Sequence, residues 1–159
     1  RDVERSRGLG DVYKRQASDC WPRMDMGLFC AAVADFSPEP LGPQKFKKEG
    51  RQDGFSIRFT ANPDILRTLS HQRREGQKVL GFAAETTPDM DSLLELARGK
   101  RARKDADLLA GNRVNSGDSG FGAATNSMAV VDRTGHEEIW PNQSKADVAW
   151  DLCSWLLRL

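Results

Sequence analysis

The sequence predicts an α/β domain built on a doubly wound, mostly parallel sheet. Two apolar runs, residues 26–34 and 78–84, have the length and composition of strands buried on both faces of a sheet. Each run is followed at once by an acid, Asp35 or Glu85. Segments with the helical spacing of apolar residues alternate with the strands along the chain. A segment of alternating apolar and polar residues, 55–60, adds a small antiparallel hairpin to this sheet.

The first strand leads into a loop rich in proline and glycine, which excludes a helix or a central strand. Three lysines follow in this loop: Lys45, Lys47 and Lys48. Open α/β sheets bind ligands outside the carboxyl ends of their strands, so Asp35, the stiff loop and the lysines predict a site for a nucleoside triphosphate. A capped strand followed by a solvated basic loop explains the same residues without a ligand.

The alternating segment 55–60 predicts an edge strand that pairs with the region around Lys45. After it, Asn62 is the predicted N-cap of a helix, with Pro63 at its first position and its end near Gly76. The free backbone N–H groups at this helix start suit an anion, although an ordinary capped helix accounts for the pattern equally well.

A second helix is predicted over residues 89–104, with Leu93, Leu94, Leu96 and Ala97 facing inward. Its last turns carry five cations: Arg98, Lys100, Arg101, Arg103 and Lys104. Basic residues complement the dipole at a helix end, which explains part of this cluster. Lys100 and Lys104 are four residues apart and share one helix face, so the pair is suited to hold one polyphosphate.

Two further strands, residues 107–112 and 127–132, flank a glycine-rich segment, 115–122. That segment has neither the spacing of a P-loop nor the position of a dinucleotide-binding turn, because a strand follows it. Ser144 then caps a last helix that runs to about Leu157. The apolar stripe of this helix consists of Val148, Leu152, Trp155 and Leu156.

Composition narrows the classes of function. The 159 residues suit one domain, 30% of them are charged, and the net charge of +1 provides no global attraction to nucleic acid or to a membrane. No apolar run approaches the roughly 20 residues that a membrane span needs. The three cysteines, Cys20, Cys30 and Cys153, form no CxxC pair, which disfavours a disulfide scaffold or a zinc site and favours a reducing cytosol.

The amino-terminal segment differs from the rest of the chain. Residues 1–16 carry charges of mixed sign without an apolar period, and ERSRGLGDVYKRQ resembles translated adapter sequence. We therefore expect residues 1–20 to be non-native or disordered and residues 21–159 to form the domain.

A resemblance covers residues 21–159. The ordered motifs AAVADF, PQKFKK, NPDIL, GFAAET, KRARKDADLLAGN, GFGAATN and SKADVAWDL resemble phosphopantothenoylcysteine synthetase, the phosphopantothenate–cysteine ligase that forms the C-terminal half of a bifunctional bacterial flavoprotein. The resemblance implies a Rossmann-like, cytoplasmic enzyme of coenzyme A biosynthesis. It also implies a homodimer, a flavin-dependent decarboxylase domain on the N-terminal side in the parent protein, and no flavin in this part.

The implied reaction has two steps. The carboxylate of 4′-phosphopantothenate attacks the α-phosphate of CTP, with Mg²⁺ present, and releases pyrophosphate; the amine of L-cysteine then displaces CMP from the acyl-cytidylate. Residue by residue, the resemblance assigns Lys45 as catalytic and places the CTP-binding positions at Asp35, Lys45, Pro63, Asp64, Ile65, Leu66, Phe82, Lys100 and Lys104. Metal ligands are not implied. Ammonium groups suit a triphosphate because its charge must be neutralised before it is attacked.

The sequence departs from the family pattern at one place. The family's glycine-rich GGT-type turn and an asparagine-bearing stretch do not occur before Trp21, so we expect the first βα unit of the sheet to be missing. A non-catalytic CTP-binding or subunit-interaction module is therefore an alternative to the ligase. Nucleic-acid binding through residues 45–48 and 98–104 is disfavoured, because Phe46 is the only aromatic residue within these two clusters and the net charge of the chain is near neutral.

Overall fold

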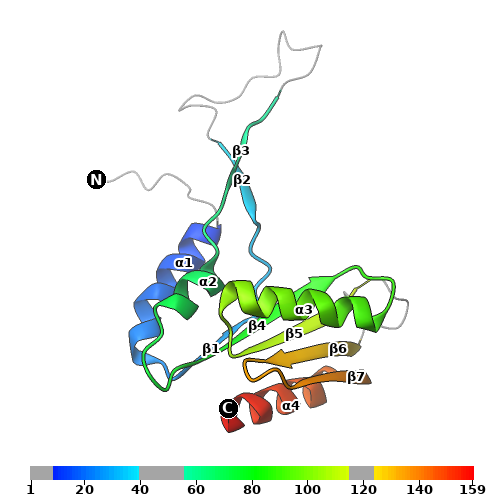
Figure 1. The fold of residues 1–159 in the computed structure, drawn as a ribbon. Helices are drawn as coiled ribbons and strands as arrows, with labels where there is room; N and C mark the ends of the chain where they lie inside the picture. The colour runs from blue at the N-terminus through cyan, green and yellow to red at the C-terminus, as the bar shows by residue number, and fades with distance from the viewer. Residues whose placement is uncertain (1–8, 40–55, 115–123) are drawn as a thin grey trace.

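The computed structural model describes residues 9–39, 56–114 and 124–159, and its centre is a five-stranded sheet (Figure 1). The strand order is β1-β4-β5-β6-β7, where these are β1 (Met26–Phe29), β4 (Lys78–Glu85), β5 (Leu108–Arg113), β6 (Thr125–Asp132) and β7 (Glu137–Ser144). The first three strands are parallel, β6 is antiparallel to β5, and β7 is antiparallel to β6. Only β6 therefore runs against the others, and the predicted doubly wound, mostly parallel α/β class is confirmed.

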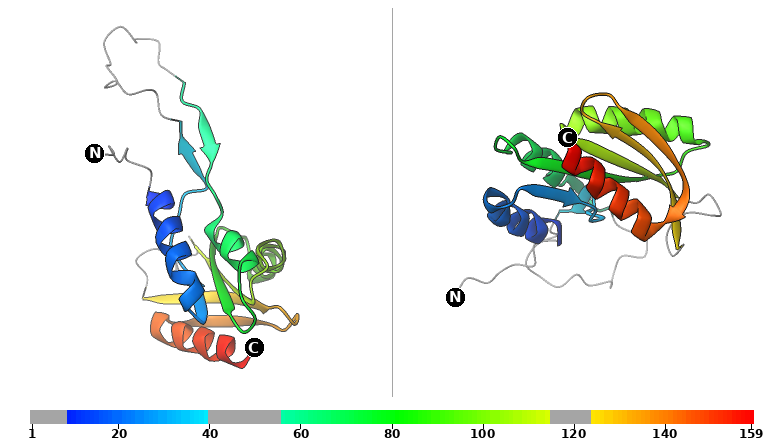
Figure 2. Two further views of the ribbon diagram at one scale, coloured as in Figure 1. Left: turned by 90° about the vertical axis from the view of Figure 1, so that its left-hand side faces the viewer. Right: turned by 90° about the horizontal axis from the view of Figure 1, so that it is seen from below.

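The predicted antiparallel hairpin is also confirmed. Strands β2 (Phe36–Pro38) and β3 (Phe59–Ala61) form a separate two-stranded sheet that stands off from the body of the molecule (Figure 2). The strand β3 begins at Phe59, whereas a strand was predicted over residues 55–60, and residues 56–58 are not part of a strand. Its strand partner is β2, and the Lys45 region that we expected beside it lies outside the described residues.

Helix α4 (Lys145–Arg158) packs on one face of the sheet (Figures 1 and 2). Its predicted start and stripe are confirmed: the Ser144 side chain accepts a hydrogen bond from the Asp147 N–H at 3.1 Å, and the buried residues are Val148, Leu152, Trp155 and Leu156. Trp155 lies against Trp140 of β7, with ring centroids 6.1 Å apart.

Helix α3 (Met90–Lys104) covers the opposite face. Its N-cap is Asp89, whose side chain accepts from the Ser92 N–H at 2.7 Å. Leu93, Leu94 and Ala97 are buried as predicted, but the prediction for Leu96 is wrong, since this side chain is 42% exposed. At about 100° per residue, Leu96 falls to the side of the stripe that the three buried residues define.

Helix α2 (Ile65–His71) packs beside α3 on the same face, and its N-cap is Asp64 rather than the predicted Asn62. The Asn62 side chain instead ties the base of the hairpin, because its oxygen accepts from Ser37 Oγ and its nitrogen donates to the Ala34 carbonyl, both at 2.8 Å. The helix ends at His71, before Gly76. Gly76 has a φ of +82° and belongs to the turn into β4.

The first strand departs from its prediction. Residues 26–34 were expected to form one strand buried on both faces, but only Met26–Phe29 is a strand, and Leu28 is 50% exposed. The reason is position: within the described residues β1 pairs with β4 alone and lies at the edge of the sheet. An edge strand lacks a second neighbour to extend its ladder and cover its side chains.

The amino-terminal segment, which we expected to be non-native or disordered, contains a helix. Residues Leu9–Cys20 form helix α1, which a 3₁₀ turn, Trp21–Arg23, follows. Ala17 of this helix packs against a buried cluster that includes Trp21, Leu66 and Leu69, and this apolar contact favours the helix. That the segment is non-native stays a prediction.

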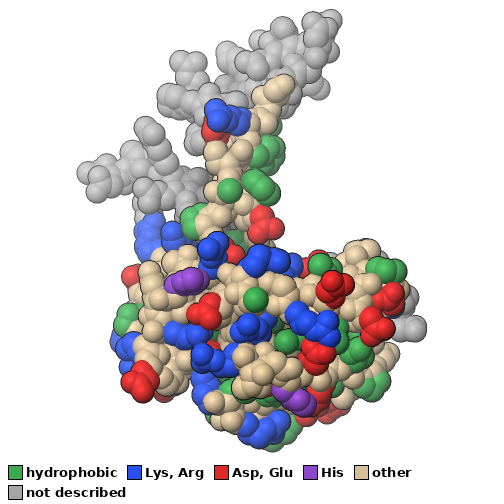
Figure 3. Space-filling model, in the orientation of Figure 1, with side chains coloured by type: hydrophobic (Ala, Val, Ile, Leu, Met, Phe, Trp, Pro, Cys, Tyr) green, Lys and Arg blue, Asp and Glu red, His purple; other side chains and the backbone are tan. Residues whose placement is uncertain are grey.

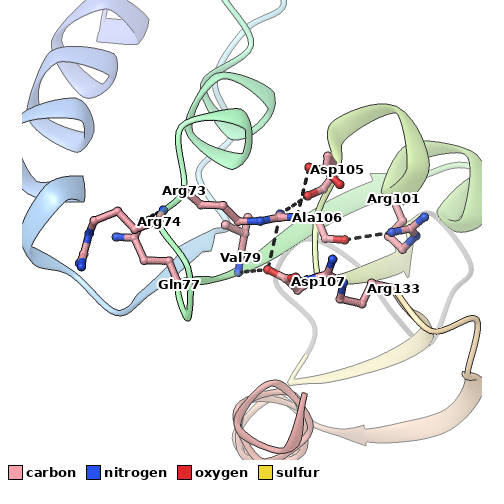
Figure 4. A network of polar contacts seen from close by, with 9 residues as sticks. All are labelled: Arg73, Arg74, Gln77, Val79, Arg101, Asp105, Ala106, Asp107 and Arg133. Atoms are coloured by element: carbon pink, nitrogen blue, oxygen red, sulfur yellow. Dashed lines mark hydrogen bonds and ion pairs between the residues drawn. The ribbon is translucent and has the colours of Figure 1, made fainter.

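A network of charges joins the amino ends of β4 and β5 (Figure 4). Asp107 is 2% exposed, and its carboxylate accepts from the Val79 N–H at 2.8 Å. Its oxygens lie 2.9 Å from a terminal nitrogen of Arg133 and 3.7 Å from one of Arg73. Because Arg73 follows α2 and Arg133 lies between β6 and β7, the buried carboxylate joins the start of β4, the end of α2 and the β6–β7 turn.

None of the helices in the described ranges is long and apolar enough to cross a membrane.

Gly81 allows α2 to approach β4 closely. A Cβ atom at this position would lie 2.6 Å from Leu66 Cδ2 and 3.1 Å from Leu109 Cδ1. We expect Gly81→Val to lower the free energy of unfolding by about 1–3 kcal/mol through overpacking, as measured by urea denaturation. Gly135→Ala, in open space at a φ of +90°, shows the cost of backbone strain without overpacking. Because Gly81 has no such φ, the absence of a measurable loss in Gly81→Val would contradict the packing argument.

Asp132 links the β6–β7 turn to α4. Burial favours the neutral acid, but hydrogen bonds from Thr134, Trp155 and the His136 N–H outweigh it and lower the pKa of Asp132. A lowered pKa stabilises the fold above the unfolded value of about 3.9, and this stabilisation is lost as the pH falls through the folded value. Asp132→Asn should therefore destabilise the protein at pH 7, and the difference should narrow below about pH 4 in urea unfolding. A difference that widens on acidification would contradict this assignment.

Candidate functional site

A cavity of about 480 Å³ opens between β1, the segment that follows it, and the start of α2. Its lining contains predicted site residues from four separate parts of the chain: Asp35, Pro63, Asp64, Ile65, Leu66, Phe82 and Lys104. Lys100 is not part of the lining, and Lys45 lies outside the described residues. The fold thus gathers residues that are far apart in the sequence around a cavity beside the edge strand β1.

The floor of the cavity is apolar. Trp21 and Phe29 line it with their rings edge to face, 6.4 Å between centroids, and Leu66 and Leu69 of α2 lie beside them. Trp21 is 5% exposed, and its indole N–H has no partner among the described residues. An apolar floor with few polar groups at its rim is typical of sites for small organic ligands.

Asp35 lies at the rim rather than at the tip of β1. It directly precedes β2, its side chain is exposed, and its carbonyl accepts from the Asn62 N–H at 2.7 Å. The predicted position at a strand end is wrong because β1 ends at Phe29. The hydrogen bonds of Asn62 at the hairpin base nevertheless bring Asp35 next to Pro63 and Asp64.

Asp64 and Lys104 meet at the same rim. The Oδ1 atom of Asp64 accepts from the Arg67 N–H at 3.0 Å, and its Oδ2 atom lies 3.2 Å from Lys104 Nζ. The lysine comes from the last turn of α3 and the aspartate from the cap of α2. This ion pair was not foreseen from the sequence, where Asp64 was assigned only to a ligand.

Lys100 pairs with another acid, Glu85 at the end of β4. Arg98 forms a bidentate pair with Glu137 of β7, with Nε and Oε2 2.7 Å apart, and Arg101 donates to the Ala106 carbonyl. The hydrogen bond from Arg98 lowers the pKa of Glu137. Basic and acidic side chains are accordingly interleaved over this face in Figure 3. The predicted basic cluster is in large part neutralised by internal acids.

None of these contacts makes a metal centre. Within the described ranges no three His, Cys, Asp or Glu side chains are grouped so that they could hold an ion. Cys30 lines the cavity and is exposed, but partial desolvation, and then the charge of Cys153, raise the pKa of its thiol. A raised pKa disfavours the thiolate, which is the nucleophilic form of cysteine.

Comparison with known sequences identifies relatives of the whole described chain. The family described as the DNA/pantothenate metabolism flavoprotein C-terminal domain matches residues 9–159. The coenzyme A biosynthesis bifunctional protein CoaBC of Bacillus subtilis is 36% identical over 128 residues, which are 80% of this chain and 30% of that protein. This chain therefore spans less than a third of the length of that relative.

Two solved structures share the fold. The crystal structure of the C-terminal domain of a CoaBC protein superimposes with a TM-score of 0.66 at 23% identity, over 91% of this chain and 61% of the other. A Cab2 H337A mutant in complex with phosphopantothenate-cysteine has a TM-score of 0.60 at 20% identity, over 94% of this chain and 52% of the other. At these identities the likeness concerns the fold.

Proposed function

The chain belongs to the DNA/pantothenate metabolism flavoprotein C-terminal domain family, and from this premise we propose that it is the CTP-dependent ligase part of a cytoplasmic coenzyme A biosynthetic enzyme. It joins 4′-phosphopantothenate to L-cysteine. The pantothenate carboxylate attacks the α-phosphorus of CTP, and the bond to the β-phosphate breaks as pyrophosphate leaves. The cysteine amine then attacks the acyl carbon, loses its proton and expels CMP.

The observation that carries this proposal is the set of residues around one cavity. The resemblance assigns Asp35, residues 63–66, Phe82 and Lys104 to CTP, and these residues line the same space although they are far apart in the sequence. The apolar floor suits a base and ribose, and Lys104 at the rim suits a phosphate. Lys45 is the proposed catalytic lysine, and Lys100 a further phosphate contact.

The proposed Mg²⁺ is consistent with this lining. Magnesium is held in such sites by substrate phosphates, waters and one or two carboxylates rather than by a full protein cage. Asp35 at the exposed rim is suited to be such a carboxylate. When bound, the metal would supply positive charge that neutralises the triphosphate.

Partner proposals rest on the relatives and on the hairpin. Phe36 and Phe59 are 61% and 57% exposed on the two hairpin strands, and an exposed aromatic pair favours a subunit contact such as the proposed homodimer. The CoaBC relatives are bifunctional proteins much longer than this chain, which supports a flavin-dependent decarboxylase domain elsewhere in the parent protein and no flavin in this part.

A chimera tests the reaction. The chain should replace the equivalent segment of the Bacillus subtilis relative, and mass spectrometry should follow CTP, Mg²⁺, phosphopantothenate and cysteine. We expect phosphopantothenoylcysteine, with pyrophosphate and CMP in equal amounts. CTP binding without any amide product in a folded chimera would contradict the ligase and favour the alternative, a non-catalytic CTP-binding module.

A further inference from the structure

The carboxylate of Asp64 has two different partners. Its Oδ1 atom caps α2 through the Arg67 N–H, and its Oδ2 atom pairs with Lys104 Nζ at 3.2 Å. The side chain of Asp64 is 38% exposed and that of Lys104 is 29% exposed. The pair is thus open to exchange with an anion from the cavity, which both residues line.

The same ammonium group is proposed to bind a phosphate of CTP. An anion that reaches Lys104 must either displace Asp64 or lie beside it, and a second negative charge within a few ångströms is repelled. Asp35 adds a further negative charge to the rim of the cavity. In the absence of a ligand, Lys104 is therefore neutralised by an acid of its own chain.

We propose that Asp64 is an internal counter-ion that competes with the phosphates of the substrate for Lys104. This inference rests on the proposed function in using the same site. Glu85 holds Lys100 in a comparable pair, so the two of the three assigned CTP lysines that lie within the described residues each have an acidic partner.

The competition discriminates between ligands by charge. The attraction of an anion to Lys104 grows with the charge of the anion, so a triphosphate competes with the carboxylate better than a monophosphate does. In the proposed reaction the substrate is CTP and the last nucleotide product is CMP. Once the polyphosphate has left, Asp64 therefore returns to Lys104 and opposes its rebinding at the same residue.

Asp64→Asn isolates the charge from the cap. Asparagine is as good an N-cap as aspartate, so α2 keeps its start while the competing charge is removed. We expect the affinity for inorganic tripolyphosphate to rise about 3–10-fold, because a lost ion pair of this exposure and a lost like-charge repulsion each contribute a few-fold. Isothermal titration calorimetry measures the affinity on the intact chain. CMP binding should change less.

A double-mutant cycle separates this effect from a change in net charge. Lys104→Met removes the shared partner, and Asp64→Asn should then give no gain in tripolyphosphate affinity. Asp89→Asn is the matched control, since Asp89 caps α3 in the same way through the Ser92 N–H but is not part of the cavity lining. It should leave the affinity unchanged.

Three outcomes would overturn the inference: an unchanged or weaker affinity in Asp64→Asn, a gain that persists without Lys104, or no tripolyphosphate binding by any variant. Failure of the proposed function has a different signature. In that case CTP binds no better than tripolyphosphate and the chimera forms no amide, while the coupling between Asp64 and Lys104 remains measurable.

Discussion

Asp107→Ala should lower the free energy of unfolding by about 3–5 kcal/mol, the usual cost of removing one partner from a buried charged network. The substitution leaves the Val79 N–H without its acceptor and removes the acid that faces Arg73 and Arg133. Because these partners belong to β4, the end of α2 and the β6–β7 turn, the loss should appear as one cooperative shift in a urea unfolding curve.

Two further variants of this network should lower the free energy of unfolding by smaller amounts. Asp107→Asn keeps an oxygen for the Val79 N–H and should cost less than the alanine variant. Asp105→Asn changes a half-exposed carboxylate whose backbone, at a φ of +51°, asparagine tolerates, so we expect a change of less than about 1 kcal/mol. A loss below about 1 kcal/mol for Asp107→Ala would show that the network contributes little to stability.

Lys104→Gln should reduce pyrophosphate release in the chimera on the order of 10²-fold. A charged contact to the transition state is typically worth this much once the bound substrate excludes water. The free energy of unfolding should hardly change, because Lys104 and Asp64 are 29% and 38% exposed and pairs of this exposure contribute little. Initial rates of pyrophosphate release, together with a urea unfolding curve, measure both quantities.

Arg103→Gln is the matched control for the lysine. It removes a neighbouring, exposed cation of α3 that does not line the cavity, and its rate should stay near that of the parent chain. Lys104→Arg should restore part of the activity if charge at this position matters. Equal rates for Lys104→Gln and Arg103→Gln would show that Lys104 is not part of the proposed site. We expect Lys45→Gln to lower the rate as Lys104→Gln does.

The elements with strong local signals were predictable from the sequence. Ser144 and the apolar stripe behind it define α4, because capping and periodicity there agree. The buried runs of β4, β5 and β6 were recognised for a similar reason: each is apolar on both faces and occupies the interior of the sheet.

Strand β7 gave no such signal. Trp140 is the only residue of this strand that is buried, and Pro141 interrupts the pattern of alternation. Proline is tolerated there because β7 lies at an edge of the sheet, where a backbone N–H can be missing from the ladder. The prediction for β1 was wrong in the opposite direction, since its apolar composition suggested an interior strand but it lies at an edge. Only tertiary pairing decides whether a strand has two neighbours.

The candidate site was predictable as a set of residues but not as a set of contacts. Motif resemblance identified Asp64, Lys100 and Lys104, and the strand-end position of Glu85 was visible in the sequence. That Glu85 and Asp64 each hold one of the lysines depends on how α3 crosses β4 and α2. No periodicity in the sequence encodes this crossing.

The positions of the tryptophans give the two sides of the molecule separate optical reporters. Trp21 lines the cavity, whereas Trp140 of β7 and Trp155 of α4 pack against each other between that helix and the sheet. Trp155 also contacts the His136 ring at a centroid distance of 5.0 Å. Trp150 is 75% exposed and contributes a solvent-like emission. In a Trp150→Phe background, a change in intrinsic fluorescence on filling the cavity would come from Trp21, while the pair under α4 would report on the docking of that helix.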